Sequence, residues 1–170
     1  TFTALKDDNA TRVIVLTGAG RAFSAGRDLK ERGVKGLSGG GKHTGASLMN
    51  AVTGTGKPLI GAINGFAITG GFELALMCDI LMGSPKTQFA DTHVRMGVVP
   101  GWGLSQRLAR LIGASRAKEL SFTGNYLGAE LAEQWGLVNR ILPEDELVAH
   151  CQGLAREMCS VVPETLAEVR

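Results

Sequence analysis

The sequence predicts an α/β fold with mostly parallel strand pairing, in which residues 1–170 form a single domain. Two observations support this prediction. Short runs of β-branched and apolar residues alternate along the chain with longer stretches of helix-forming residues, as in folds built from strand and helix units. The chain has 170 residues, of which 44% are hydrophobic. This is enough for one sizeable core and too few residues for two ordinary domains.

The predicted elements begin with a buried strand that is ended by a glycine-containing turn. Helix 73–78 is apolar on all sides and is therefore expected to be buried. Residues 32–47 are polar and Gly-rich without a period, which predicts a mobile surface loop. Strands are predicted at residues 13–16, 59–63, 79–82, 87–90 and 137–142, and helices at 73–78, 104–111, 115–122, 129–135 and, as the final helix, 144–159.

Composition argues against several classes of protein. The 18 basic and 16 acidic residues are spread along the chain without a basic block, so nucleic acid is a poor partner. The three cysteines show neither disulfide nor zinc spacing, which favours a reducing compartment. The apolar stretches 59–68 and 74–82 are too short to cross a membrane. We expect a soluble intracellular protein, cytoplasmic first, with mitochondria and peroxisomes as alternatives because the termini are uninformative.

Nucleotide and hydrolase motifs fail on individual residues. The segment 36–43 resembles a phosphate-binding loop, but His43 stands where a Ser or Thr hydroxyl is needed. Gly18 and Gly20 follow a strand, yet Phe23 occupies the third glycine position of a dinucleotide site. Ser105 does not lie in a GxSxG nucleophile motif, because Arg107 stands at the position of the last glycine.

A stronger candidate site lies in the sequence AITGGFELA at residues 67–75. Gly70 and Gly71 at the predicted helix start leave backbone N–H groups unobstructed, and such groups attract negative charge. Glu73 follows one turn inside the helix, where a carboxylate beside an oxyanion site is suited to proton transfer next to a carbonyl. The alternative is structural: the glycines permit tight packing and Glu73 pairs with a buried basic residue.

Several ordered motifs together resemble the crotonase superfamily, in its enoyl-CoA hydratase/isomerase branch. They are FSAGRDLK at residues 23–30, GAING at 61–65, GGFELA at 70–75, CD at 78–79, PGWGLSQRL at 100–108 and GLV at 136–138. The resemblance implies a spiral of ββα units that form two roughly perpendicular sheets wrapped by helices. It also implies a homotrimer or a dimer of trimers. Relative to the family pattern, an N-terminal strand-rich portion and the last C-terminal helices are expected to be absent.

The resemblance also implies roles for individual residues. Two main-chain N–H groups, of Arg27 and Gly70, would hold the thioester oxygen, and Gly101 would help to hold water. Glu73 matches the family's first catalytic glutamate. The coenzyme A portion would run along Ala25, Gly26, Arg27, Asp28, Leu29 and Lys30, with Lys30 either a phosphate partner or a solvated surface lysine.

His93 is the main departure from the family pattern, because it stands where hydratases carry a second glutamate. A histidine that titrates near neutral pH could pass a proton in either direction. If the segment is extended, Asp91 lies on the same face and could orient the ring. The alternative is that His93 only satisfies a buried hydrogen bond.

The sequence therefore predicts an enoyl-CoA hydratase that acts on a trans-2-enoyl-CoA through a stabilised enolate. No metal or cofactor is expected beyond the coenzyme A of the substrate, and no membrane partner. The alternatives are another crotonase-type enzyme, such as a double-bond isomerase, hydrolase or decarboxylase, or a non-catalytic acyl-CoA-binding relative. Isomerisation can proceed with one base, whereas hydration needs water held between two proton-transferring groups.

Overall fold

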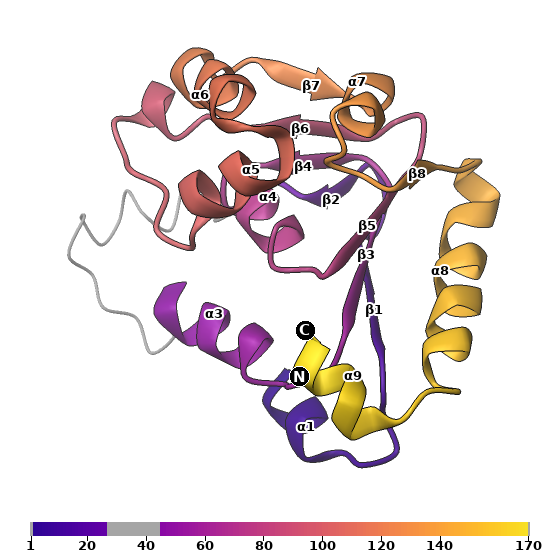
Figure 1. Cartoon of the computed structure of the whole chain (residues 1–170). Coiled ribbons are helices and arrows are strands. Elements are labelled where there is room, and N and C mark those ends of the chain that lie inside the picture. Colours follow the sequence, from indigo (N-terminus) through magenta and orange to yellow (C-terminus); the bar gives the residue numbers. More distant parts are fainter. Residues whose placement is uncertain (1, 27–44, 170) are drawn as a thin grey trace.

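The computed structural model of the protein describes residues 2–26 and 45–169 and contains two four-stranded sheets (Figure 1). The first sheet, in the order β1-β3-β5-β8, is parallel throughout, and in the second, β2-β4-β6-β7, only β7 is antiparallel. The strands of the first sheet are β1 (Ile14–Thr17), β3 (Leu59–Ile63), β5 (Ile80–Gly83) and β8 (Arg140–Ile141). Those of the second are β2 (Ala22–Ser24), β4 (Phe66–Ile68), β6 (Gln88–Ala90) and β7 (Tyr126–Gly128).

The chain alternates between the two sheets. β1, β3 and β5 each lead directly into a strand of the second sheet, and their directions cross in Figure 1. This agrees with the predicted α/β spiral of ββα units. The helices are α1 (Phe2–Asp7), α3 (Gly45–Thr53), α4 (Gly70–Ala75), the 3-10 helix η1 (Val94–Met96), α5 (Leu104–Ile112), α6 (Ala114–Thr123), α7 (Ala129–Gln134), α8 (Glu144–Met158) and α9 (Pro163–Val169).

The predicted strand β3 is buried along its whole length, because both faces of the parallel sheet are covered. On one face, Leu147 and Cys151 of α8 pack against Ile60 and neighbouring strands. On the other face, the largest core cluster joins the two sheets, α4, α5 and α6. Its centre includes the rings of Phe72 and Phe89, whose centroids lie 4.9 Å apart.

The turns that link the sheets explain the glycines after β1. A Cβ on Gly18 would lie 2.0 Å from the carbonyl oxygen of Ala22, so only glycine fits there. The Gly18 N–H donates to Oδ1 of Asn64 at 3.0 Å, and Nδ2 of Asn64 donates to the Gly20 carbonyl at 3.0 Å. These contacts join the β1–β2 turn to the β3–β4 turn. Gly18 therefore serves close packing of the turn, whereas Gly20, with φ 74°, has a backbone conformation that favours glycine.

Three sequence predictions need correction. The strand predicted at 137–142 is only β8, because the amides of Leu137 and Val138 both donate to the Ala132 carbonyl and close the end of α7. The helix predicted as the last is followed by α9. The loop predicted at 32–47 ends earlier, since α3 begins at Gly45; residues 27–44, which include the segment 36–43, lie outside the described residues.

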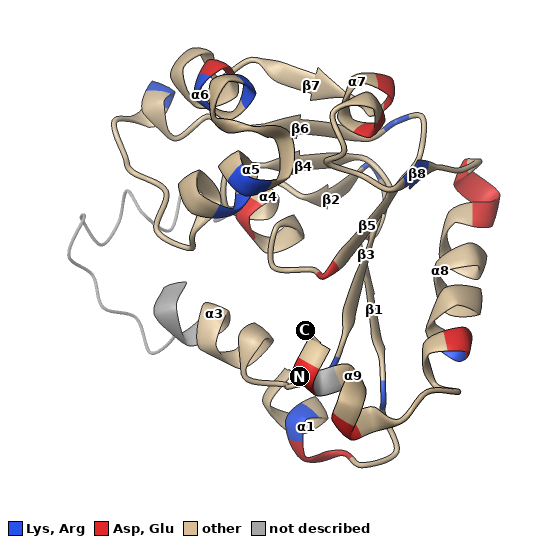
Figure 2. Ribbon diagram, viewed as in Figure 1, with Lys and Arg blue, Asp and Glu red and all other residues tan. Residues whose placement is uncertain are grey.

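Charged residues of both signs are interspersed over the helices in the view of Figure 2. For example, the surface ion pair between Lys86 and Glu144, at 2.7 Å, links the loop after β5 to the start of α8. In the described part of the chain, no helix combines the length and apolarity needed to cross a membrane.

Candidate active site

The candidate site lies where two neighbouring parallel strands end. Ile68, the last residue of β4, pairs with Ala90, the last residue of β6. The Thr69 N–H donates to the Ala90 carbonyl at 2.9 Å and extends this pairing by one residue. Helix α4 and residues 91–93 therefore begin side by side, although they are about twenty positions apart in sequence.

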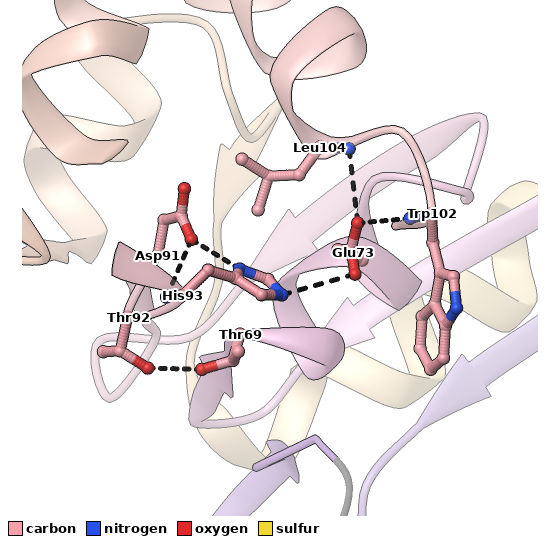
Figure 3. Close-up of polar contacts among 7 residues, drawn as sticks. All are labelled: Thr69, Glu73, Asp91, Thr92, His93, Trp102 and Leu104. Atoms are coloured by element: carbon pink, nitrogen blue, oxygen red, sulfur yellow. Dashed lines mark hydrogen bonds and ion pairs between the residues drawn. The ribbon is translucent and has the colours of Figure 1, made fainter. Parts of the chain in front are cut away.

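Glu73 is held at the centre of the site. It is only 3% exposed, and its Oε1 accepts hydrogen bonds from the amides of Trp102, at 2.6 Å, and Leu104, at 3.5 Å. Its Oε2 lies 3.5 Å from Nε2 of His93 (Figure 3). One carboxylate oxygen is thus fixed by the backbone of the loop before α5, and the other faces His93.

Asp91 fixes His93 from the opposite side of the ring. Its Oδ1 lies 2.6 Å from Nδ1 of His93 and also accepts the His93 backbone N–H at 3.3 Å (Figure 3). This contact was expected only if the segment were extended, and that expectation is wrong. His93 has φ −55° and ψ −44° and is the residue that precedes η1. A turn of the kind that aspartate forms with its own backbone two residues on brings the two side chains together instead.

The two carboxylates hold the His93 ring in its charged form. Burial alone lowers the pKa of the imidazole, but the hydrogen bonds and charges of Asp91 and Glu73 outweigh it and raise the pKa of His93 to about 9. Burial likewise opposes ionisation of Asp91, yet the hydrogen bond from His93 keeps the pKa of that carboxyl below its ordinary value. The expectation that His93 titrates near neutral pH is therefore wrong. At pH 7 the ring is an imidazolium and can only donate protons.

The two glycines at the start of α4 have different surroundings. A Cβ on Gly71 would lie 1.9 Å from the Ser24 carbonyl oxygen, so Gly71 serves close packing of α4 on β2. Gly70 is more open: its nearest neighbours for a Cβ are the Trp102 ring, at 3.4 Å, and Gly26, at 3.5 Å. Within the described residues, the Gly70 N–H has no hydrogen-bond acceptor. This amide is therefore a candidate hydrogen-bond donor to a ligand.

A cavity of about 310 Å³ opens beside these groups. Its wall includes the Gly70 backbone, the Glu73 carboxylate and the His93 ring, so the polar groups predicted from sequence share one space. Trp102 is one of the wall residues. The lining residues are Ala25, Ile68, Thr69, Gly70, Glu73, Thr92, His93, Met96, Val98, Val99 and Trp102.

The remaining predicted site residues divide into three groups. Ala25 lines the cavity, and Gly26 lies beside Gly70 with φ +87°, a conformation that favours glycine. Gly101 is exposed and is not among the described lining residues; its neighbour Trp102 supplies the amide that bonds Glu73. The predicted positions Arg27, Asp28, Leu29 and Lys30 lie outside the described residues.

The sequence reasoning missed Thr69 and Thr92, whose hydroxyl groups contact each other across the two segments (Figure 3). Thr69 has φ 54°, the one positive φ of a non-glycine residue in the described chain. The pairing depends on the register of β4 and β6, so no local pattern signals it. Val98 and Val99, which line the cavity, were also missed.

The sequence profile of the enoyl-CoA hydratase/isomerase family matches residues 1–170. The chain belongs to this family. It is 43% identical over 154 residues to the protein named "Probable enoyl-CoA hydratase 1, peroxisomal" of Arabidopsis thaliana, a match that covers 91% of this chain and 58% of the relative. A crystal structure of an enoyl-CoA hydratase subunit from Geobacillus kaustophilus superposes with a TM-score of 0.85 at 37% identity, covering 99% of this chain and 65% of that one.

Other members of the enoyl-CoA hydratase/isomerase family that resemble this chain have different names. One is the 2,3-dehydroadipyl-CoA hydratase of Escherichia coli, 36% identical over 96% of this chain and 64% of its own. Another is a solved monofunctional enoyl CoA isomerase from M. smegmatis, with a TM-score of 0.82 at 34% identity, covering 99% of this chain and 72% of that one. The chain spans 53% to 64% of the lengths of its curated relatives.

Proposed function

We propose that this protein is an enoyl-CoA hydratase that adds water across the double bond of a trans-2-enoyl-CoA. The observation that carries the proposal is the pair of Glu73 and His93, whose Oε2 and Nε2 lie 3.5 Å apart and face one cavity beside the open Gly70 amide. A base, an acid and an oxyanion donor in one space are the groups that the reaction requires. The names of the relatives support the same activity.

In the proposed reaction, the Gly70 N–H donates a hydrogen bond to the thioester oxygen. Glu73 removes a proton from water as the water oxygen bonds to Cβ, and electrons of the double bond move onto the thioester oxygen to give an enolate. The two amides that bind Glu73 Oε1 leave Oε2 as the oxygen that takes this proton. Hydrogen bonds to the developing negative charge lower the barrier more than hydrogen bonds to the neutral carbonyl do.

His93 completes the addition as the acid. Its imidazolium donates the Nε2 proton to Cα, so the enolate collapses to the 3-hydroxyacyl thioester. The reaction leaves Glu73 protonated and His93 neutral. Because the two atoms are only 3.5 Å apart, transfer of that proton from Oε2 to Nε2 restores both groups without a proton from elsewhere. Asp91 acts through His93, by orienting the ring and stabilising its charge.

The segment after β2 is proposed to bind the coenzyme A portion. Ala25 lines the cavity and Gly26 adjoins Gly70, so the chain enters residues 27–30 from a point beside the open amide. In this proposal the Arg27 N–H is the second oxyanion donor, and Lys30 contacts phosphate. No further cofactor takes part in the steps above.

For the complete protein we propose a homotrimer or a dimer of trimers in a reducing compartment, with the cytoplasm as the first candidate. Sedimentation equilibrium tests the assembly, and cell fractionation tests the location. A monomer in sedimentation, or recovery with mitochondria or peroxisomes, would overturn the respective proposal.

Product analysis decides between the two leading activities. The complete protein is incubated separately with crotonyl-CoA and with a 3-enoyl-CoA, and products are separated by chromatography. Hydration predicts a 3-hydroxyacyl-CoA from crotonyl-CoA. Double-bond isomerisation is the second candidate, supported by the solved isomerase relative; it predicts a 2-enoyl-CoA from the 3-enoyl-CoA and no hydrated product. No conversion of either compound would favour a non-catalytic acyl-CoA-binding protein.

A further inference from the structure

Asp91 uses only one of its two carboxylate oxygens to hold His93. Oδ1 accepts both hydrogen bonds from that residue, one from the ring and one from the backbone. Oδ2 is buried and has no hydrogen-bond partner among the described residues, and in Figure 3 it points away from the ring. Asp91 is only 1% exposed, so bulk water does not supply a donor. A buried carboxylate oxygen without a donor is costly, because the charge has lost its hydration.

Two groups close to Asp91 in the sequence are engaged elsewhere. The hydroxyl group of Thr92 contacts the hydroxyl group of Thr69. The guanidinium group of Arg95 is directed at helix α6, where its Nε and Nη2 donate to the Thr123 carbonyl at 3.1 Å and 2.9 Å. Neither group therefore supplies the donor for Oδ2.

The Arg95 contacts attach the end of α6 to the segment that carries His93. Thr123 is the last residue of α6, and Arg95 lies in η1, which packs against this helix. Gly124 leaves room for the guanidinium group, since a Cβ there would lie 2.6 Å from Nε of Arg95. The last turn of α6 is therefore held beside the segment of the proposed acid.

Ser121 lies in this last turn of α6. It follows the buried Leu120 and comes one helical turn after the buried Ala117, so it is on the inward side of the helix, and it is itself partly buried. Burial opposes the ionisation of Asp91, whereas His93 and the Ser121 hydroxyl, acting as donors, lower the pKa of that carboxyl. Because both His93 bonds use Oδ1, the oxygen left for the serine is Oδ2.

We propose that Ser121 is a positioning residue for the proposed acid: its hydroxyl donates to Oδ2 of Asp91 and fixes the carboxylate that orients the His93 ring. Rotation about the Cα–Cβ bond of the serine directs the hydroxyl at this oxygen. With both oxygens held, the plane of the carboxylate is fixed, and with it the direction of Nε2 of His93. The inference rests on the proposed function for the role of His93 as the acid, and Ser121 acts only through Asp91.

Titration of Asp91 without substrate tests the contact. NMR of the complete protein with isotope-labelled aspartate follows this carboxyl, and Asp91→Asn assigns its resonance. Ser121→Ala should raise the pKa of Asp91, because the anion loses a donor. Ser115→Ala is the matched control, since Ser115 is exposed on the same helix, and it should leave this pKa unchanged. An Asp91 pKa that is the same in both variants would overturn the inference.

Steady-state kinetics tests whether the contact positions the acid. Ser121→Ala should lower kcat for crotonyl-CoA about three- to tenfold with little change in KM, since a misdirected acid affects the transition state more than binding. Ser121→Thr keeps the hydroxyl and should retain kcat within about twofold. An unchanged kcat in Ser121→Ala, or equal losses in both variants, would refute the positioning role even if the pKa of Asp91 moves.

A double-mutant cycle shows whether Ser121 acts through Asp91. Asp91→Asn removes the charge that the serine is proposed to direct at the ring, so adding Ser121→Ala to it should change kcat by less than about twofold. A serine that only supports packing would lower kcat by the same factor with and without the Asp91 carboxylate. That result would contradict the inference.

The two proposals fail separately. If the protein does not hydrate crotonyl-CoA but the pKa of Asp91 rises only in Ser121→Ala, the contact between Ser121 and Asp91 stands and the hydratase proposal falls. If Ser121→Ala hydrates crotonyl-CoA at the wild-type rate and the pKa of Asp91 does not move, the hydratase proposal stands and the inference about Ser121 falls.

Discussion

The hydroxyl group of Thr69 contacts the hydroxyl group of Thr92 and joins the residue before Gly70 to the residue before His93. Thr69 has φ 54° and ψ −113°, a costly conformation for a β-branched residue. Its ψ sets the plane of the peptide bond that carries the Gly70 N–H. The contact therefore helps to aim the proposed oxyanion donor and keeps it in register with the proposed acid.

Thr92→Val removes this hydroxyl and keeps the shape of the side chain. We expect kcat for crotonyl-CoA to fall roughly tenfold with little change in KM, because a misaimed donor affects the transition state more than the ground state. Stability should fall by about 1 kcal/mol. Thr92→Ser, which keeps the hydroxyl, is the control and should recover most of kcat. Equal losses in both variants would argue against the positioning role.

Glu73→Gln is expected to lower kcat for hydration by about a hundredfold or more while acyl-CoA binding is retained, since the amide keeps the shape but cannot accept the proton. Steady-state rates and calorimetry with hexanoyl-CoA give the two quantities. Glu130→Gln, on the exposed side of α7, is the matched control and should leave both unchanged. Normal turnover in Glu73→Gln would remove this carboxylate from the mechanism.

The pH profile should distinguish an acid from a base at position 93. Because the pKa of His93 is raised to about 9, its proton is present at neutral pH and is lost as the pH rises through 9. We expect kcat to fall on the alkaline side near pH 9. His93→Ala should lower kcat by ten- to a hundredfold and abolish this alkaline limb. His150→Ala in α8 is the control. A limb that persists in His93→Ala would belong to another group.

Asp91→Asn should lower the pKa of His93 because it removes one of the two negative charges on the ring. We expect the alkaline limb to move to lower pH by about one unit or more, and NMR titration of the ring should show the same shift. Asp145→Asn, at the start of α8, is the control. A profile that does not move would mean that Asp91 has no electrostatic effect on His93.

The free energy of unfolding should also depend on the ionisation of His93. A raised folded-state pKa contributes stability that is complete below the ordinary value of 6.5 and is lost as the pH rises through about 9. The free energy of unfolding of the wild type should therefore decrease between pH 6.5 and pH 9.5. The decrease should be smaller in Asp91→Asn. Urea denaturation at several pH values measures it, and equal slopes in the two proteins would contradict the linkage.

Gly71→Ala should destabilise the fold by about 1–3 kcal/mol or more, because the new Cβ would meet the Ser24 carbonyl oxygen at 1.9 Å and force α4 away from β2. Gly101→Ala is the matched control, since no heavy atom lies within 4 Å of a Cβ built there. Thermal unfolding compares the two variants. Equal melting temperatures would show that α4 can shift without cost.

The buried strand β3 was predictable from the sequence, and so was the three-residue β6, whereas three other short strands were not. β3 occurs at the predicted residues because a run of five buried apolar residues needs no partner to be recognised. β2, β4 and β7 have three residues each, too few for a period, and β4 follows β3 so closely that the two apolar runs merge. Packing against neighbouring strands decides such elements, and the local sequence does not record it.

The candidate site was also predictable only in part from the sequence. Glu73 and His93 could be named from the order of motifs along the chain, and the structure brings both to one cavity. The charge state of His93 could not be predicted from the sequence, because it depends on the Glu73 carboxylate, which reaches Nε2 from a neighbouring strand end. The Thr69–Thr92 contact depends on the same strand register.

The turn at residues 91–93 has a consequence for how this kind of site can diverge. Asp91 binds both the backbone and the ring of His93, so three consecutive residues contain the proposed proton donor and the group that orients it. Glu73 is anchored independently, by the loop before α5. The proposed donor and the residue that orients it are therefore confined to one tripeptide. Recombination or a few substitutions could replace His93 with a carboxylate, or remove it, without changing the anchoring of Glu73. Transplanting Asp-Thr-His onto the same strand end of a relative should carry the alkaline pH limit with it.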